Sequence, residues 1–345
     1  MSANSTIFLD VYPWLNDIRC TGVVPKTGVY RHTEALAPLF QPVYFCAETE
    51  APMPDWVCAK AEQALGKPVR CYSSVSNLAG AGCEVWLSTA IDAPAPFITE
   101  ATPFLKVAIL HDTLALEGYF GRKKVEIYKR GYLGFDVLLS VSKHAVDCLE
   151  RHACYDLPAR THAPEIIPYG NFHLLQKLPE VPPLRDEGWM GSLFNLYHRK
   201  RLDKCMQLAA RLKRRLLHVG GTTEEFGAAD MLYNSLKNVS FMGTLPDELL
   251  PTFYQSLWGF SFLSEAEGFG IPPLEAILYG VRHIYLSPIP AHLEVYESYP
   301  VNFVHDPADP RLSYYAITPE ARRRAFNDRR FSKVARHALK WLAEV

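Results

Sequence analysis

The chain has 345 residues, of which 48% are hydrophobic and 21% are charged, and its formal net charge is −1. This length is too great for one ordinary core and predicts two domains, while a nearly neutral chain lacks the basic field of a nucleic-acid-binding protein. No apolar run approaches the roughly 18 residues that a membrane-spanning helix needs. We therefore expect a globular protein that does not cross a membrane.

Cysteine usage and the N-terminus indicate a cytoplasmic protein. The eight cysteines include no Cys-x-x-Cys pair, and no Cys/His group has the spacing of a zinc site. Several lie in apolar runs, so we expect buried, reduced thiols. The first residues lack the basic region and apolar core of a signal peptide.

The first half of the chain alternates apolar segments with helical ones. We predict strands at 6–11, 42–46, 84–88, 104–110, 135–142 and 164–171, and helices at 29–37, 55–65 and 143–151. A loop is expected over residues 12–27, ending at Thr27 and Gly28. This order predicts an α/β domain with a doubly wound sheet, in which ligands bind at the carboxyl ends of the strands.

Three features of this half are candidates for function. Gly28, at the start of a predicted helix, lets a phosphate or an acceptor approach the backbone, unless it is an ordinary turn glycine. His111 follows a buried strand, where it either donates a hydrogen bond to a sugar hydroxyl or carbonyl or is a structural histidine. Residues 119–132 are basic and aromatic, which suits a charged glycan, a membrane surface or a solvated helix.

The prolines and charges of residues 176–187 predict a linker. The α/β alternation then restarts, with strands at 188–191, 216–221, 239–243, 258–264 and 283–286, and helices at 201–214, 247–254 and 272–278. We predict domains at 1–175 and 188–317, followed by a C-terminal helix at 318–345.

The most informative stretch runs from Glu267 to Glu275 and reads EGFGIPPLE. It follows an apolar strand and combines a glycine loop with a helix start, so its backbone N–H groups and helix dipole would attract an anion. A carboxylate at each end suits hydroxyl groups attached to that anion. The pattern predicts a site for a sugar phosphate or a sugar nucleotide.

This stretch, preceded by Ser264 and followed by Ala276 and Gly280, resembles the Glu-x7-Glu motif of retaining GT-B glycosyltransferases of the family-4 type, also called glycosyl transferases group 1. The lead-in over residues 239–250 is similar too, and the resemblance is densest over 239–294. It implies the GT-B fold, with two Rossmann-like doubly wound domains. The first binds the acceptor, the second binds the nucleotide sugar, and the C-terminal helix returns to the first.

The resemblance also implies roles for residues that match the motif. Glu267 contacts the donor sugar and Glu275 accepts hydrogen bonds from the ribose hydroxyls. Lys200, with Arg199, neutralises the diphosphate. The backbone amides that meet the diphosphate and the sugar are those of Phe269, Gly270 and Ile271.

Further roles come from the rest of the chain. Backbone groups near Gly243 and Thr244 would read the base, His111 would reach the donor sugar, and Thr27 with Gly28 would form a phosphate and acceptor loop. One departure is Ser192, which stands just after the glycine where the family often has an arginine, with Arg201 as a candidate substitute.

The implied activity is transfer of a hexose or deoxyhexose from a nucleotide sugar to a glycan, lipid-linked or small-molecule acceptor, with retention of anomeric configuration. The chain contains no Asp-x-Asp triplet, so we predict no metal, and the nucleotide sugar is a substrate, so we predict no cofactor. The expected location is the cytoplasm, with contact at the inner membrane surface as an option. Two alternatives stay open: a sugar-nucleotide epimerase of the same fold, and a non-catalytic subunit that binds a nucleotide sugar or a glycan.

Overall fold

The computed structural model describes residues 6–24, 33–34, 36–91, 96–152, 165–166, 178–180, 188–221, 238–309 and 311–328. The chain divides into two units, one over Met1–His173 and one over Leu174–Arg330, and each is described by itself. Among the described helices, none is long and apolar enough to span a bilayer.

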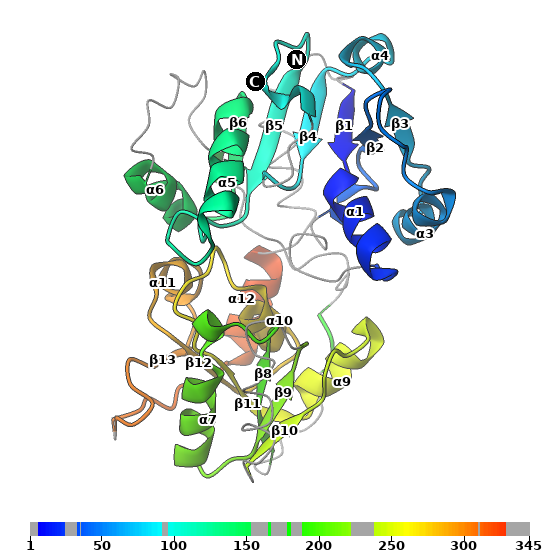
Figure 1. Ribbon diagram of the computed structural model, residues 1–345. Helices are drawn as coiled ribbons and strands as arrows, with labels where there is room; N and C mark the ends of the chain where they lie inside the picture. The colour runs from blue at the N-terminus through cyan, green and yellow to red at the C-terminus, as the bar shows by residue number, and fades with distance from the viewer. Residues whose placement is uncertain are drawn as a thin grey trace. The chain divides into compact units, whose positions relative to one another are not determined.

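The first unit is built on a seven-stranded parallel sheet with the order β3-β2-β1-β4-β5-β6-β7 (Figure 1). Its strands are β1 (Ile7–Asp10), β2 (Gln41–Phe45), β3 (Arg70–Tyr72), β4 (Val85–Ser88), β5 (Leu105–Leu110), β6 (Val137–Ser140) and β7 (Glu165–Ile166). The central strand β4 is buried along its whole length, as parallel strands covered on both faces are. The strand order reverses between β1 and β4, which makes this the switch point where such sheets bind ligands.

The helices of this unit follow its strands. They are α1 (Tyr12–Thr21), α3 (Asp55–Leu65), α4 (Val75–Gly80), the 3₁₀ helix η1 (Pro96–Thr99), α5 (Arg122–Gly134) and α6 (Lys143–His152). Helix α1 packs against α3 and β2, α5 packs against η1, and α6 packs against β6.

The expected loop over residues 12–27 is wrong for residues 12–21, which form α1. Pro13 lies in the first turn, where proline is tolerated, and Trp14 and Ile18 are buried one turn apart. Gly22 marks the end of the helix: it adopts the left-handed conformation (φ 71°) and its N–H donates to the Ile18 carbonyl at 2.8 Å. The basic and aromatic segment 119–132 contains most of α5 and is helical there.

The second unit is built on a six-stranded parallel sheet with the order β10-β9-β8-β11-β12-β13. Its strands are β8 (Trp189–Leu193), β9 (Leu216–Val219), β10 (Val239–Phe241), β11 (Leu257–Phe262), β12 (His283–Leu286) and β13 (Asn302–Phe303). The order reverses between β8 and β11. Both sheets are therefore doubly wound, and the predicted fold class of two Rossmann-like domains is confirmed.

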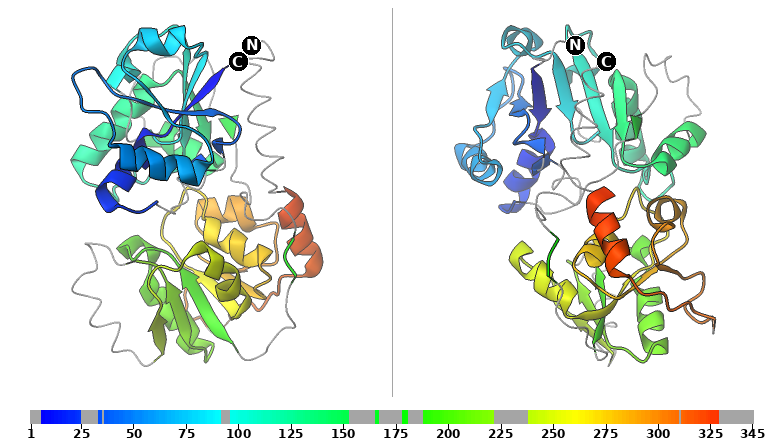
Figure 2. Two further views of the ribbon diagram at one scale, coloured as in Figure 1. Left: turned by 90° about the vertical axis from the view of Figure 1, so that its right-hand side faces the viewer. Right: turned by 180° about the vertical axis from the view of Figure 1, so that it is seen from behind.

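The helices of the second unit are η2 (His198–Lys200), α7 (Leu202–Arg211), η4 (Asp247–Leu249), α9 (Leu250–Gln255), α10 (Ile271–Leu278), α11 (Pro290–Tyr296) and α12 (Pro319–Asp328). Helix α10 is almost entirely apolar and packs on β11, β12 and α12 (Figure 2). Helix α12 is anchored by the guanidinium of Arg322, whose Nε donates to the Leu278 carbonyl at 2.7 Å. The predicted helix at 318–345 is thus present up to Asp328, and its predicted return to the first domain lies outside the described residues.

Replacement of Gly131 in α5 is expected to destabilise the first unit. An alanine Cβ there would lie 2.1 Å from the backbone oxygen of Ile91, so the helix or the chain at Ile91 must shift. Gly131→Ala should lower the free energy of unfolding by about 1–3 kcal/mol, although alanine is the better helix former. Urea unfolding measures this change. The matched control is Gly80→Ala in α4, where a Cβ meets nothing within 4 Å. Equal stability of the two variants would contradict the close packing of Gly131 against Ile91.

Candidate functional site

Two segments meet at the carboxyl end of the second sheet, beside its switch point. The chain after β8 forms η2, and the chain after β11 forms a loop over residues 263–270 that leads into α10. The N–H of Glu265 donates to the Arg199 carbonyl at 2.8 Å, and Arg199 Nη1 donates to the Ala266 carbonyl at 3.0 Å. These bonds hold η2 and the loop together.

The centre of this meeting point is the carboxylate of Glu267. Its Oε1 pairs with the Lys200 ammonium and lies 3.4 Å from Arg199 Nη1. The three side chains are only 10–15% exposed, which makes this a largely buried cluster of one anion and two cations. Lys200 Nζ also lies 4.7 Å from the centre of the Phe262 ring, a cation–π contact.

The charge states of this cluster follow from its geometry. Burial by itself raises the pKa of the Glu267 carboxyl, but the charges of Lys200 and Arg199 outweigh it and hold that pKa below its usual range. Glu267 is therefore ionised at neutral pH. One carboxylate against two cations leaves the cluster with a net positive charge, which favours an anionic ligand.

The glycine loop ends at Gly270, which caps α10 in the left-handed region (φ 84°). The helix begins with Ile271, and its next two residues, Pro272 and Pro273, have no N–H. Among the first three residues of α10, Ile271 is consequently the one that has a backbone N–H. The Tyr296 hydroxyl donates to the Gly270 carbonyl and fixes the turn.

Glu275 lies one turn into α10, on the same helix that the loop enters. The hydroxyl of Tyr254 donates to its Oε2 at 2.8 Å. Tyr254 is fully buried and stacks on Tyr279 with ring centres 5.4 Å apart, so the carboxylate is held by a rigid partner. Sequence reasoning did not identify Tyr254, because its role depends on the packing of α9 against α10.

Gly243 and Thr244 follow β10 at the carboxyl edge of the same sheet. The Gly220 N–H donates to the Gly243 carbonyl at 2.9 Å, and the side chain of Thr244 lies beside Gly221. The ends of β9 and β10 are thus adjacent, as parallel strands require. Gly243 itself has a positive φ of 66°, which glycine adopts without strain.

Ser192 stands where the family often has an arginine, and Arg201 is the candidate substitute for that arginine. The structure shows the contacts of both residues. Ser192 is a buried β8 residue whose hydroxyl lies 2.9 Å from Nδ1 of His218. Arg201 is held by Asp203 at 2.7 Å and by Glu265, and hydrogen bonding to Asp203 is the main cause that raises its pKa. The guanidinium of Arg201 is therefore already committed to two carboxylates.

His292, on α11, is a second residue that sequence reasoning missed. Its Nδ1 lies 2.9 Å from the Ser287 carbonyl, so this nitrogen carries the proton and Nε2 is an acceptor. Nε2 faces Gly270 closely enough to lie 3.2 Å from a Cβ built there. Burial lowers the pKa of His292 to about 4 against the opposing effect of Glu267, and the ring is neutral at pH 7.

In the first unit, His111 follows β5 as predicted. Its Nε2 lies 2.6 Å from the Thr89 carbonyl, so this nitrogen donates the hydrogen bond. Thr27 and Gly28 lie outside the described residues.

Asp10, at the carboxyl end of β1, was not predicted from the sequence. It lies at the switch point of the first sheet, where its Oδ1 accepts the Tyr12 N–H at 3.0 Å and its Oδ2 lies 3.4 Å from the Ser88 hydroxyl of β4. Burial raises the pKa of this carboxyl to about 7, although both hydrogen bonds lower it. A single carboxylate after a strand carries no motif, so only the tertiary structure identifies it.

Comparisons with known proteins agree with this architecture. Residues 182–313 match the family model described as Glycosyl transferases group 1. The crystal structure of Anabaena HepE in complex with UDP is similar over 99% of this chain and 100% of that chain, with a TM-score of 0.71 and 14% identity. Sucrose-phosphate synthase from Thermosynechococcus elongatus is similar over 99% of both chains, with a TM-score of 0.66 and 14% identity.

The fold is GT-B. The structure of HepE in complex with UDP-glucose has a TM-score of 0.70 at 13% identity and covers 99% of this chain and 100% of that chain. A search of curated proteins found no match in sequence. At these identities the structural likeness shows the GT-B fold alone, and the match of residues 182–313 supports a glycosyltransferase domain in its second half.

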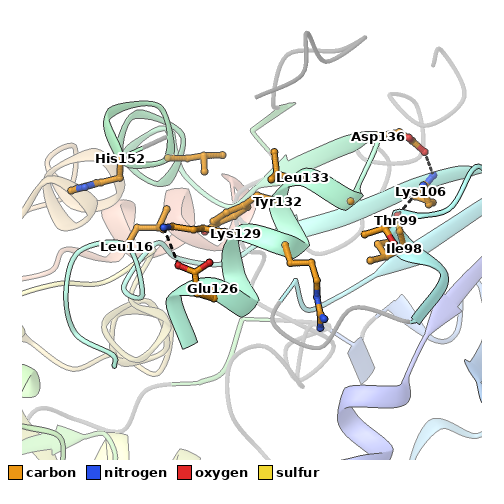
Figure 3. Close-up of a pocket in the computed structure, with 13 residues that line it drawn as sticks. Ile98, Thr99, Lys106, Leu116, Glu126, Lys129, Tyr132, Leu133, Asp136 and His152 are labelled. Atoms are coloured by element: carbon orange, nitrogen blue, oxygen red, sulfur yellow. Dashed lines mark hydrogen bonds and ion pairs between the residues drawn. The ribbon is translucent and has the colours of Figure 1, made fainter. Parts of the chain in front are cut away.

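A cavity of about 520 Å³ lies elsewhere, in the first unit (Figure 3). It is lined by α5, the end of α6, η1, Lys106 of β5, Leu116 after β5 and Asp136 before β6. Lys106, the buried cation in its wall, already donates to the Ile98 and Glu100 carbonyls. None of the predicted donor-site residues in the described part of the chain lines this cavity, whereas Lys129, Arg130 and Tyr132 of the candidate segment 119–132 do. The cavity is therefore distinct from the Glu267 cluster.

The raised pKa of Asp10 predicts a pH-dependent stability. Because about 7 exceeds the ordinary value of 3.8, the folded chain binds more protons than the unfolded chain between these values. The free energy of unfolding therefore falls as pH rises through this range, by up to about 4 kcal/mol. Asp10→Asn has no carboxyl to ionise at this position, so its free energy of unfolding should not fall in this way. The stability of the variant relative to wild type should therefore increase as pH rises from about 4 to about 8.

Thermal unfolding of both proteins across this range measures the difference. The control is Glu84→Gln, which removes an exposed carboxyl and should follow the wild-type profile. A constant difference between Asp10→Asn and wild type at every pH would contradict the buried, protonated state of Asp10.

Proposed function

We propose that the protein transfers a hexose or deoxyhexose from a nucleotide sugar to a glycan, lipid-linked or small-molecule acceptor, with retention of anomeric configuration and without a metal ion. The observation that carries this proposal is the buried Glu267 carboxylate with Lys200 and Arg199 at the switch point of the second sheet. The match of residues 182–313 to Glycosyl transferases group 1 supports it.

The first requirement of the reaction is to stabilise the leaving diphosphate. Negative charge grows on its oxygen as the bond to the anomeric carbon breaks, and fixed positive charges lower the energy of that transition state. Lys200 and Arg199 supply these charges from η2, and the amides of residues 269–271 supply oriented N–H dipoles. These groups take the place that a divalent cation has in metal-dependent transferases.

The second requirement is to bind the sugar and the nucleoside. Glu267 is ionised, so it acts on the donor sugar as a hydrogen-bond acceptor and as a negative charge near the developing oxocarbenium ion. Glu275, oriented by Tyr254, accepts hydrogen bonds from the ribose hydroxyls. Backbone groups at Gly243 and Thr244 contact the base. HepE has been crystallised with UDP and UDP-glucose, which makes uridine diphosphate sugars the first donors to test.

Retention follows from a front-face reaction in which the leaving phosphate takes the acceptor proton. A glycosidase-like pair of carboxyls would need one protonated acid. The lowered pKa of Glu267 keeps it ionised, and Glu275 is engaged by Tyr254 on a helix. Neither glutamate is therefore suited to act as the protonated acid of a glycosidase-like pair. This favours a mechanism in which the leaving phosphate of the donor accepts the acceptor's proton.

Substitution of the two glutamates should give different kinetic effects. Glu275→Ala removes the carboxylate that accepts hydrogen bonds from the ribose hydroxyls. KM for the donor should therefore rise by about 10–100-fold, with a smaller change in kcat. Glu267→Ala removes a group that acts on the developing charge, and kcat should fall by at least about 100-fold. Release of nucleoside diphosphate at varied donor concentrations measures both constants.

The donor is first identified by the melting temperature in the presence of uridine, guanosine, adenosine and thymidine diphosphate sugars. The donor that stabilises wild type should stabilise Glu275→Ala less. Wild-type rates for both variants, at limiting and saturating donor, would overturn these site assignments. Interconversion of the sugar without transfer would instead indicate an epimerase, and donor binding without turnover or exchange a non-catalytic subunit.

Chelation should leave the transfer reaction intact. Lys200 and Arg199 supply the positive charge that neutralises the diphosphate, so a chelator such as EDTA removes nothing that this step needs. Initial rates with EDTA and with added Mg²⁺ should agree within about twofold, which corresponds to less than about 0.5 kcal/mol. Circular dichroism serves as the control that the chain stays folded, and a strict requirement for a divalent cation would refute the metal-free step.

A further inference from the structure

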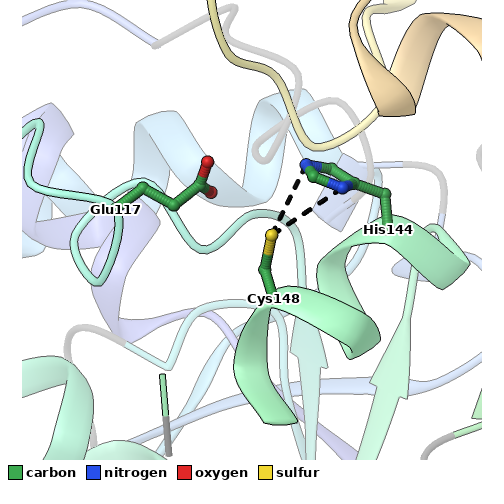
Figure 4. A group of neighbouring side chains, drawn as sticks. All are labelled: Glu117, His144 and Cys148. Atoms are coloured by element: carbon green, nitrogen blue, oxygen red, sulfur yellow. Dashed lines mark hydrogen bonds between the residues drawn. The ribbon is translucent and has the colours of Figure 1, made fainter. Parts of the chain in front are cut away.

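A cluster of three metal-binding side chains lies in the first unit, apart from the proposed donor site. His144 and Cys148 are one helical turn apart on α6, and Glu117 comes from the segment that follows β5 (Figure 4). The Sγ atom of Cys148 lies 3.7 Å from each ring nitrogen of His144. One ligand atom from each of the three residues falls within 4.8 Å of the others.

The separation between Cys148 Sγ and the ring nitrogens of His144 matches that across a tetrahedral zinc site. Zinc binds thiolate sulfur at about 2.3 Å and imidazole nitrogen at about 2.0–2.1 Å, which at a tetrahedral angle separates the two atoms by about 3.6 Å. The observed 3.7 Å from Cys148 Sγ to His144 Nδ1 or Nε2 already has this value. Zinc binding would require the imidazole to turn about its Cβ–Cγ bond so that one nitrogen faces the common centre.

Neighbouring groups orient the side chains of Glu117 and Cys148. The Thr113 hydroxyl donates to Glu117 Oε1 at 2.7 Å, and Thr113 is itself buried. Arg151 Nη2 donates to Cys148 Sγ at 2.9 Å. Hydrogen bonds of this kind orient ligands at metal sites, and Arg151 can keep its bond to a thiolate that is also bound to a metal.

We propose that Glu117, His144 and Cys148 bind a Zn²⁺ ion. A thiolate with an imidazole selects a borderline metal such as zinc over Mg²⁺ or Ca²⁺, which prefer oxygen ligands. On binding, the S–H bond of Cys148 breaks, its proton passes to solvent, and a Zn–S bond forms without any change of oxidation state. The two negative ligands balance the charge of the ion, and water takes the fourth position.

A reactive thiol is the competing interpretation of the same cluster. Burial raises the pKa of Cys148, and the carboxylate of Glu117 adds to this effect, while Arg151 opposes it. Cys148 is also only 2% exposed, so an external substrate would not reach its sulfur. Reactive cysteines have a lowered pKa and partial exposure, so the surroundings of Cys148 suit a structural ligand better than a nucleophile.

The ion would tie α6 to the segment that carries His111. Thr113 and Glu117 follow His111 within six residues, and the rest of the cluster lies on α6. Such a link would stabilise the carboxyl edge of the first sheet. The cluster belongs to a different unit from Lys200 and Arg199, so zinc here supplies no charge to the proposed transfer step.

Metal binding to the full chain tests this proposal without an activity assay. The chain is treated with chelator under reducing conditions, freed of chelator, and titrated with Zn²⁺ or Co²⁺ alone. We expect one equivalent of metal bound per chain, a thiolate-to-cobalt charge-transfer band in the near ultraviolet, and a higher melting temperature with zinc.

Variants assign the site. Cys148→Ser and His144→Ala should each weaken binding by more than about 100-fold, the upper range for loss of a supporting group, and Cys148→Ser should abolish the cobalt band. Cys20→Ser removes an exposed thiol on α1 and should bind like wild type. Circular dichroism without metal confirms that each variant is folded.

The outcomes are decisive in both directions. Absence of the cobalt band in wild type, or a band that persists in Cys148→Ser, would overturn the site. Glu117→Gln should keep the band, because the thiolate remains, but should weaken binding by at least about tenfold. Unchanged affinity in Glu117→Gln would exclude the carboxylate as a ligand.

Discussion

The second unit depends on one buried interaction, the carboxylate of Glu267 held by Lys200 and Arg199. A buried carboxylate without partners would be strongly unfavourable, and removal of both cations would leave its charge uncompensated. The pairing therefore requires η2, after β8, to lie beside the loop after β11. The two cations that stabilise the buried Glu267 carboxylate are also the ones that would neutralise a diphosphate. One cluster therefore stabilises the fold and supplies the charge that the proposed reaction needs.

Topology explains why this cluster forms where it does. In each sheet the strand order reverses once, between β1 and β4 in the first and between β8 and β11 in the second. The chains leaving the two strands at a reversal run to opposite faces and open a crevice at the carboxyl edge. Asp10 lies at the first reversal and Glu267 follows the second, so each unit buries a carboxylate at the position where its fold binds ligands.

The two buried carboxylates differ in charge because their partners differ. Asp10 has only neutral hydrogen-bond donors, so burial prevails and raises its pKa to about 7. Glu267 is also buried, but two cations reverse the balance and lower its pKa. Neutral His292, with its acceptor nitrogen toward Gly270, shows the same effect of burial on a base. The neighbouring charges and hydrogen bonds, more than burial itself, determine whether each buried group is charged or neutral when a ligand binds.

The sequence by itself determined the fold class, nearly every strand of both sheets, and the glycine loop between Glu267 and Glu275, because these depend on short-range patterns of apolar residues, glycine and proline. The loop predicted from the sequence at α1 was wrong, because Pro13 and Gly22 are as typical of the start and end of a helix as of a turn. Only the tertiary structure decided the pairing of Glu267 with Lys200, the contact of Tyr254 with Glu275, and the cluster of Glu117 with α6. Such contacts join residues far apart in the chain, and packing between elements, which no local pattern encodes, brings them together.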